Sequence, residues 1–168
     1  MGSEVEQSGA LVEHGGCDSA IKLQRFSGKY SLCVDDKSRV VIVAAFRGGL
    51  SGRAILRKNR RQKCVEVLPL AVWEAFLGKL AALSALDEDV QRLVTLESAS
   101  AVEVSVDKQG RMLLPAEMRS FAGIGGSEVV MTGANDRLKV WEPSVWNEFE
   151  KQAAMEDLEA RVFAKYGL

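Results

Sequence analysis

The chain has 168 residues, 47% of them hydrophobic, which is enough to bury the core of one compact domain or of two small interlocked ones. Its formal net charge is −1, and no apolar run approaches the roughly 20 residues of a membrane-spanning helix, so an integral membrane protein is excluded. Residues 1–24 have no cationic start followed by an apolar stretch, so we expect no signal peptide and a cytoplasmic protein.

Residues 1–24 are acidic, contain several glycines and have little apolar content, which predicts a disordered extension. After them, β-branched and aromatic residues between turn formers predict short strands and helices. In the first half we expect strands over residues 30–34, 40–43, 53–57 and 64–68, a turn over 35–38, a helical turn over 44–47, a helix that begins after Pro69, and a second helix over 87–96.

The second half repeats this order of elements. We expect a half-buried strand over residues 102–106, a turn over 107–110, a strand over 111–114, a short helix over 115–122, a hairpin of strands 127–132 and 137–141, and a long amphipathic helix after Pro143. Aromatic pairs recur in the two long helices, as V-W-x-x-F at Val72 and again at Val145. We interpret these aromatic residues as core anchors.

One short motif is also written twice. Asp35 to Arg39 and Asp107 to Arg111 share the form D-x-x-x-R and lie 72 residues apart, and each runs into an apolar stretch. A further arginine follows at the same offset, Arg47 in the first copy and Arg119 in the second. A repeat of this length indicates one small unit used twice, with each half unable to bury its core alone.

The charge is unevenly divided along the chain. Residues 1–24 carry −3, residues 25–79 carry +8, and residues 80–168 carry −6. A segment this basic in a nearly neutral protein favours a polyanionic partner. An equally compatible alternative is a basic face that pairs with the acidic half of the same or a neighbouring subunit. If the partner is DNA, the basic half should face the duplex.

Residues suited to catalysis or metal binding are sparse. The three cysteines, Cys17, Cys33 and Cys64, form no C-x-x-C pair, and the single histidine, His14, lies in the polar N-terminal stretch. We therefore expect no metal site, no disulfide framework and no cofactor. No nucleophile motif or phosphate-binding glycine loop is present, so we expect neither an enzyme nor a small-molecule substrate.

The two turns have the chemistry of a nucleic-acid contact. Each aspartate can bond the backbone N–H groups of its turn, which leaves Arg39 or Arg111 projecting beside it. Arginine can grip phosphate or read the edge of guanine with paired hydrogen bonds. The alternative is an internal Asp–Arg salt bridge that only fixes the turn.

The chain resembles the MraZ family of bacterial transcriptional regulators, within the SpoVT/AbrB group of swapped-hairpin DNA-binding proteins. The resemblance spans about residues 25–150. It is carried by Phe26-Ser27-Gly28, by Asp35-x-Lys37-x-Arg39, by Asp107-Lys108-Gln109-Gly110-Arg111-Met112-Leu113-Leu114-Pro115, and by the helices at Val72-Trp73-Glu74 and Val145-Trp146-Asn147.

The resemblance implies an α+β fold, in which two β-α-β units interlock as a swapped-hairpin (AbrB-like) β-barrel with helices packed outside. The division it implies is an extension over 1–24, a first SpoVT/AbrB-like repeat over 25–97, a second over 98–150, and a helical extension over 151–168. It further implies a homo-oligomeric ring in the cytoplasm, associated with the nucleoid. The ring would bind double-stranded DNA at repeated G-rich promoter boxes, mostly to repress its own cell-division and cell-wall gene cluster.

The DNA-contacting role carries over to Lys37 and Arg39 in the first turn and to Lys108 and Arg111 in the second. The charge argument adds phosphate contacts by Arg60 and Arg61. Asp35, Asp107, Arg47 and Arg119 are expected to support the turns.

Two residues depart from the family pattern: Ser38 stands where the family has glycine, and Val43 where it has proline. They motivate an alternative, a ring-forming interaction protein that has lost specific DNA binding. If position 38 has a positive φ, serine should carry a conformational penalty there.

Overall fold

The computed structural model describes residues 25–83 and 87–167 of the chain. The expected disordered extension over residues 1–24 lies outside the described residues. Within them the first half contains β1 (Lys29–Cys33), β2 (Arg39–Val41), α1 (Ala44–Arg47), β3 (Arg53–Asn59), β4 (Cys64–Leu68), α2 (Leu70–Ala81) and α3 (Glu88–Ser100). The second half contains β5 (Val102–Ser105), β6 (Arg111–Leu113), α4 (Ala116–Ala122), β7 (Glu128–Gly133), β8 (Leu138–Trp141), α5 (Pro143–Met155) and α6 (Leu158–Tyr166).

Strands from the two halves exchange partners. Six strands form one antiparallel sheet in the order β1-β7-β8-β4-β3-β5, and β2 pairs separately with β6. In the repeat, β1 corresponds to β5, β3 to β7 and β4 to β8. When every strand is replaced by its counterpart, the same sheet order results, read from the opposite edge. The first strand of each half therefore pairs with the third strand of the other half, β1 with β7 and β5 with β3.

The α+β class is confirmed, but the expected closed barrel is not. Among the described residues the large sheet stays open, because its edge strands β1 and β5 do not pair with each other. An isolated bridge joins Val34 to Val40 between β1 and β2, and β2 leaves the large sheet to pair with β6. The two halves therefore pair through β1–β7, β4–β8 and β3–β5 in the large sheet, and through β2–β6 in the small one.

One core lies between the large sheet and the small helices. Its completely buried side chains include residues from both halves, such as Val40 and Ile42 from the first and Met112, Leu114 and Met118 from the second. A second cluster forms where Trp141 packs edge-on against Trp146, with ring centroids 5.3 Å apart. Trp146 is only partly buried against this cluster, whereas Trp73 of α2 is buried, so the expected role as core anchor is confirmed for Trp73.

The helices begin close to where the sequence predicts, but α3 ends at Ser100, four residues beyond its expected end. Pro69 and Pro115 precede α2 and α4 with φ near −55°, and the Asp87 side chain caps α3 by accepting hydrogen bonds from the backbone N–H groups of Asp89 and Val90. Gly123 ends α4 in the left-handed conformation. One break was not expected: the helix after Pro143 stops at Met155 and resumes as α6, with Asp157 at φ 45° between them.

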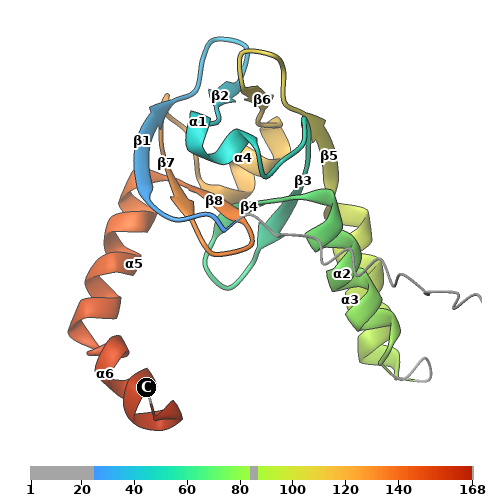
Figure 1. Cartoon of the computed structure of the whole chain (residues 1–168), viewed down its shortest axis with the longest axis vertical. Coiled ribbons are helices and arrows are strands. Elements are labelled where there is room, and N and C mark those ends of the chain that lie inside the picture. The colour runs from blue at the N-terminus through green and yellow to red at the C-terminus, as the bar shows by residue number, and fades with distance from the viewer. Residues whose placement is uncertain (1–24, 84–86, 168) are drawn as a thin grey trace, which may run out of the picture.

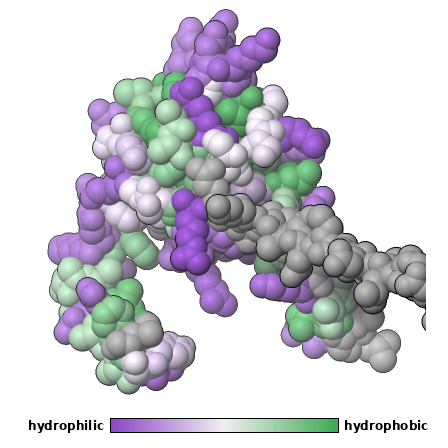
Figure 2. Space-filling view, in the orientation of Figure 1, coloured by the Kyte–Doolittle hydropathy of each residue, from purple (hydrophilic) through white to green (hydrophobic). Residues whose placement is uncertain are grey.

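The molecule has two distinct ends (Figure 1). The β1–β2 and β5–β6 turns lie side by side at one end, at the top of the view. Two helical arms, α2 with α3 and α5 with α6, extend from the other end on opposite sides. Figure 2 shows hydrophilic surface over the turns and apolar patches on the α5–α6 arm. Among the described residues, no helix combines the length and the apolar character needed to cross a membrane.

Candidate nucleic-acid interface

The first D-x-x-x-R turn is organised by its aspartate. Oδ1 of Asp35 accepts the backbone N–H groups of Lys37 at 3.0 Å and Arg39 at 2.8 Å. The chain closes on itself through a second pair of bonds, from the N–H of Ser38 to the carbonyl oxygen of Asp35 and from the N–H of Asp35 to that of Arg39. Short Asp side chains favour such reversals because they replace backbone partners.

The second turn repeats these contacts. Oδ1 of Asp107 accepts the N–H groups of Gln109 and Arg111, each at 2.9 Å. The N–H of Gly110 donates to the carbonyl oxygen of Asp107, and the N–H of Asp107 donates to that of Arg111. The expected turn-supporting role of both aspartates therefore has a geometric basis in identical hydrogen bonds.

Each arginine of the motif forms an ion pair with its own aspartate. Nε of Arg39 lies 2.8 Å from Oδ2 of Asp35, and Nη2 lies 2.7 Å from the same oxygen. Nε of Arg111 lies 2.8 Å from Oδ2 of Asp107. The two arginine side chains remain about one-third exposed, Arg39 at 27% and Arg111 at 33%. The internal salt bridge is thus formed, while each arginine side chain stays partly accessible to a further partner.

These contacts shift the acid–base properties of the turn. The Arg39 side chain, with the backbone N–H of the same residue, holds the pKa of Asp35 below its ordinary value. The backbone N–H of Arg111, followed by its side chain, holds the pKa of Asp107 low in the same way. The pKa of Arg39 is raised by Asp35 and, more weakly, by Asp107. The two turns are therefore close enough to influence each other electrostatically.

The exposed ends of the turns carry the lysines. Lys37 and Lys108 are both exposed, and neither forms an ion pair with any residue that the structure describes. The turns are adjacent because β2 and β6 pair antiparallel, with Val41 opposite Arg111 and Arg39 opposite Leu113. Four of the predicted DNA-contacting residues, Lys37, Arg39, Lys108 and Arg111, thus lie at one end of the molecule (Figure 1).

The later arginines contact the turns of the opposite repeat. Arg47 lies against Gly110 in the second turn, and Nη1 of Arg119 donates to Oγ of Ser38 in the first turn at 3.1 Å. Sequence spacing placed each of these arginines beside the motif of its own repeat. The spacing could not reveal that each arginine contacts the turn of the opposite repeat, because this contact depends on the pairing of β2 with β6.

The two departures from the family pattern have different structural consequences. Ser38 has φ +58°, close to the +80° of Gly110 at the equivalent position, so the expected backbone penalty applies. Val43 has φ −58° and ψ 146°, nearly the same as Pro115 at the equivalent position before α4. Valine therefore keeps the backbone that proline would impose.

The remaining predicted contacts lie elsewhere. Arg53 is at the turn end of β3, because it pairs with Ser105 just before the second turn. Asn59 is six residues further along the strand, about 20 Å away at the usual rise per residue. Arg60 and Arg61 follow it, in the β3–β4 hairpin loop at the end opposite the turns (Figure 1).

The positive charge of this hairpin is partly neutralised. Arg60 pairs with buried Glu97 at 3.3 Å, and Arg57 pairs with Glu97 at 2.6 Å and with buried Glu66 at 2.7 Å. Both arginines therefore meet carboxylates of the same chain, as the charge-pairing alternative anticipated. Arg61 is exposed and forms no ion pair among the described residues.

Comparison with known proteins gives a consistent result. Residues 98–165 match a family model described as "MraZ protein, putative antitoxin-like". The transcriptional regulator MraZ of Acetivibrio thermocellus is 39% identical over 74% of this chain and 85% of its own length. The proteins of the same name from Carboxydothermus hydrogenoformans and Thermomicrobium roseum are 37% and 32% identical, over 93% and 84% of their own lengths.

Proposed function

The chain belongs to the MraZ family, and we propose that it is a sequence-specific DNA-binding regulator of transcription. The observation that carries this proposal is the pair of matching turns at one end of the molecule. Each turn presents an exposed lysine beside a guanidinium whose orientation is fixed by an aspartate. Fixed donors lose less conformational entropy on binding, so such turns suit the recognition of base edges and phosphates.

The finer assignment follows the family resemblance. We propose that the protein acts in the cytoplasm, on nucleoid DNA, as a repressor of its own cell-division and cell-wall gene cluster. Arg39 and Arg111 would read guanine in repeated G-rich promoter boxes, with Lys37 and Lys108 on the adjacent phosphates. The exchange of β1 and β5 between the halves supports two repeats of the swapped-hairpin class, with α6 belonging to a C-terminal helical extension.

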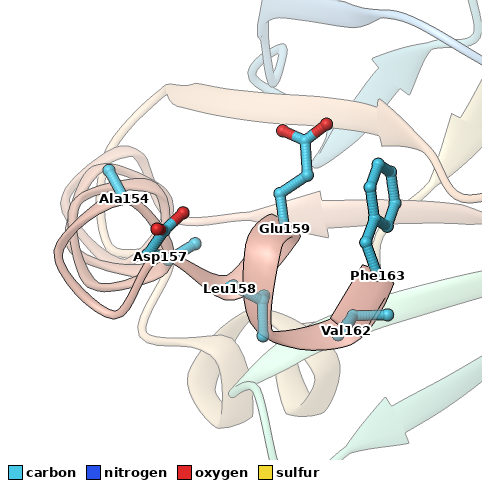
Figure 3. Close-up of a pocket in the computed structure, with 7 residues that line it drawn as sticks. Ala154, Asp157, Leu158, Glu159, Val162 and Phe163 are labelled. Atoms are coloured by element: carbon cyan, nitrogen blue, oxygen red, sulfur yellow. The ribbon is translucent and has the colours of Figure 1, made fainter. Parts of the chain in front are cut away.

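We also propose a homo-oligomeric ring, because both helical arms present apolar residues to solvent. The α5–α6 arm exposes Met155, Leu158, Val162, Phe163 and Tyr166, and the α2–α3 arm exposes Leu83, Leu93 and Leu96. An open groove of about 490 Å³ lies at the α5–α6 elbow, lined by Ala154, Leu158, Val162 and Phe163 (Figure 3).

The geometry of the arms favours a head-to-tail contact. They are different surfaces on opposite sides of the molecule, so docking the α5–α6 arm of one copy on the α2–α3 arm of the next is a heterologous interface (Figure 1). Such interfaces form a ring when the rotation closes. A ring would present several pairs of turns to tandem boxes, and weak single contacts would then combine through effective concentration.

The decisive experiment is footprinting on the DNA upstream of the protein's own gene, with a random duplex of equal length as the control. We expect several protected boxes at regular spacing and clear preference for the promoter. Equal affinity for both duplexes would instead support the ring-forming interaction protein that has lost specific binding. The double substitution of Arg39 and Arg111 by alanine should remove the preference for the promoter.

A further inference from the structure

We propose that Arg47 and Arg119 are positioning residues that act across the repeats: Arg47 fixes the second turn, and Arg119 fixes the first. This inference rests on the proposed DNA binding, because it concerns the orientation of the turns that we propose to contact DNA. It makes the two turns a coupled pair, in which each half of the chain orients the recognition surface of the other half.

Arg47 is anchored in its own repeat and covers the turn of the other. Its Nε donates to the carbonyl oxygen of Ile42 at 2.8 Å. Its guanidinium lies so close to Gly110 that a Cβ atom at that position would be 2.1 Å from Nε. The N–H of Ile42 in turn donates to the carbonyl oxygen of Gly110 at 2.7 Å. The second turn is therefore held from both its backbone and its open side.

Arg119 takes the equivalent place at the first turn, but with different contacts. The N–H of Leu114 donates to the carbonyl oxygen of Ser38 at 2.8 Å, which matches the bond from Ile42. The Arg119 guanidinium then reaches Oγ of Ser38 and, at 3.4 Å, the carbonyl oxygen of Gly126. The exchange of support is therefore reciprocal.

The serine explains why the two braces differ. A Cβ atom at position 38 occupies the space that the Arg47 guanidinium fills at Gly110, so Arg119 cannot lie over its turn in the same way. Nε of Arg119 is buried without a hydrogen-bond partner in the part of the chain that the structure describes. The first turn therefore has one hydroxyl contact to Arg119 where the second turn has the packed guanidinium of Arg47. We infer that the first turn is held less firmly than the second.

The first test measures the turns without DNA. In the full-length protein, Arg47→Lys and Arg119→Lys keep the charge but lose the planar donor set. By hydrogen exchange, we expect Arg47→Lys to accelerate exchange over residues 107–111 and leave residues 35–39 unchanged. Arg119→Lys should do the reverse. Acceleration in the turn of the same repeat, or in both turns equally, would overturn the proposal.

The second test uses promoter binding and a double-mutant cycle. Once Lys37→Ala has removed a contact from the first turn, adding Arg119→Lys should cost less affinity than it does alone, by about threefold or more. When Arg119→Lys is combined with Lys108→Ala, the loss of promoter affinity should equal the product of the losses of the two single variants. The opposite pattern, with Arg119 coupled to Lys108, would contradict action across the repeats.

The two experiments separate the inference from the proposed function. If the unmodified protein does not prefer its promoter, the proposed function fails, while the exchange measurement still decides whether the braces exist. If the promoter is preferred but the exchange rates do not follow the crossed pattern, only the present inference fails.

Discussion

Positions 38 and 110 use two residue types for one backbone conformation. Both have positive φ, which glycine adopts freely and serine adopts at a cost of about 1–2 kcal/mol. The difference also decides how closely an arginine can approach, because only glycine leaves its open side free. A single side chain thus distinguishes two otherwise matching turns.

We predict that Ser38→Gly raises the free energy of unfolding by up to about 1 kcal/mol. The backbone strain is relieved and Arg119 can settle over the turn, although glycine also gains entropy in the unfolded chain and the hydroxyl contact is lost. Urea denaturation measures the change. Gly110→Ser is the matched control and should destabilise by more than about 1–2 kcal/mol, since the serine would take on the same backbone cost and would also displace Arg47. Two changes of the same sign would contradict this account.

The exposed lysines should determine how binding depends on salt. We predict that Lys37→Ala or Lys108→Ala weakens promoter and random DNA alike, and lowers the slope of log affinity against log salt by about one unit per lost phosphate contact. Arg61→Ala, in the hairpin at the opposite end, is the matched control and should change the slope less. An equal change would show that the basic hairpin also lies on DNA, as the charge of residues 25–79 first indicated.

At the scale of elements, local patterns predicted the strands and helices well. The expected strands over residues 53–57 and 64–68 are confirmed as β3 and β4, and the short helical turn at 44–47 is confirmed as α1. These segments carry their signals in adjacent residues, such as β-branched runs and the glycines that follow α1. The strand partners carry no such signal, because β1 and β7 are brought together only by the completed fold.

The candidate site could also be predicted only in part, because local contacts can be read from the sequence and long-range contacts cannot. Spacing identified both Asp–Arg pairs, since four residues separate the partners within one turn. The charge surplus of residues 25–79 was a poorer guide. Net charge ignores pairing, and Arg57 meets two buried carboxylates, Glu66 on the neighbouring strand and Glu97, which lies 40 residues further along the chain.

The buried carboxylate of β4 links its neighbouring strands. Glu66 is 3% exposed and accepts from Arg57 of β3, Asn59 at the end of β3, and Arg137 beside β8. Burial alone would raise its pKa, but Arg137, Asn59 and Arg57 together hold the pKa below the ordinary value of 4.5. The charged form is therefore stabilised by folding.

We predict that this carboxylate contributes to acid sensitivity. Because its folded pKa is depressed, its stabilisation is complete above the unfolded value of 4.5 and is lost as the pH falls through the folded pKa. Glu66→Gln should lower the free energy of unfolding by about 3 kcal/mol at neutral pH. The melting temperature of this variant should also fall less than that of the parent protein when the pH drops below 4.5. Glu103→Gln, which breaks the exposed pair with Arg53, should cost little. An unaltered acid profile in Glu66→Gln would contradict this role.

At the scale of the whole molecule, the fold separates two kinds of surface. The turns and their lysines lie at one end, and most of the exposed large apolar residues lie on the helical arms at the other, apart from Tyr30, Val41 and Leu113 on β1, β2 and β6 (Figures 1 and 2). Assembly through the arms would therefore leave the turns free. This separation allows each property to be changed without the other.

We predict that Phe163→Asp dissociates the assembly without unfolding the subunit. Phe163 is 44% exposed and contributes no contact to either core cluster, so the subunit should lose little stability. Light scattering should show a large assembly for the parent protein and a smaller species for the variant. Lys165→Gln, on the same helix, changes the net charge by the same single unit and, as the control, should keep the assembly. A parent protein that is monomeric at micromolar concentration would contradict the ring.

The exchange of strands also constrains how the chain acquires its structure during synthesis. Lys29 of β1 pairs with Thr132, about 100 residues later in the chain. Strand β3 can pair with β5 only after α2 and α3 have been synthesised. Long-range strand pairing slows folding, because a large loop must close before its contacts form. While the ribosome is still producing the second half, the first half has unpaired strand edges that can associate with other chains. The same topology that couples the two turns thus delays the completed fold until translation has nearly finished.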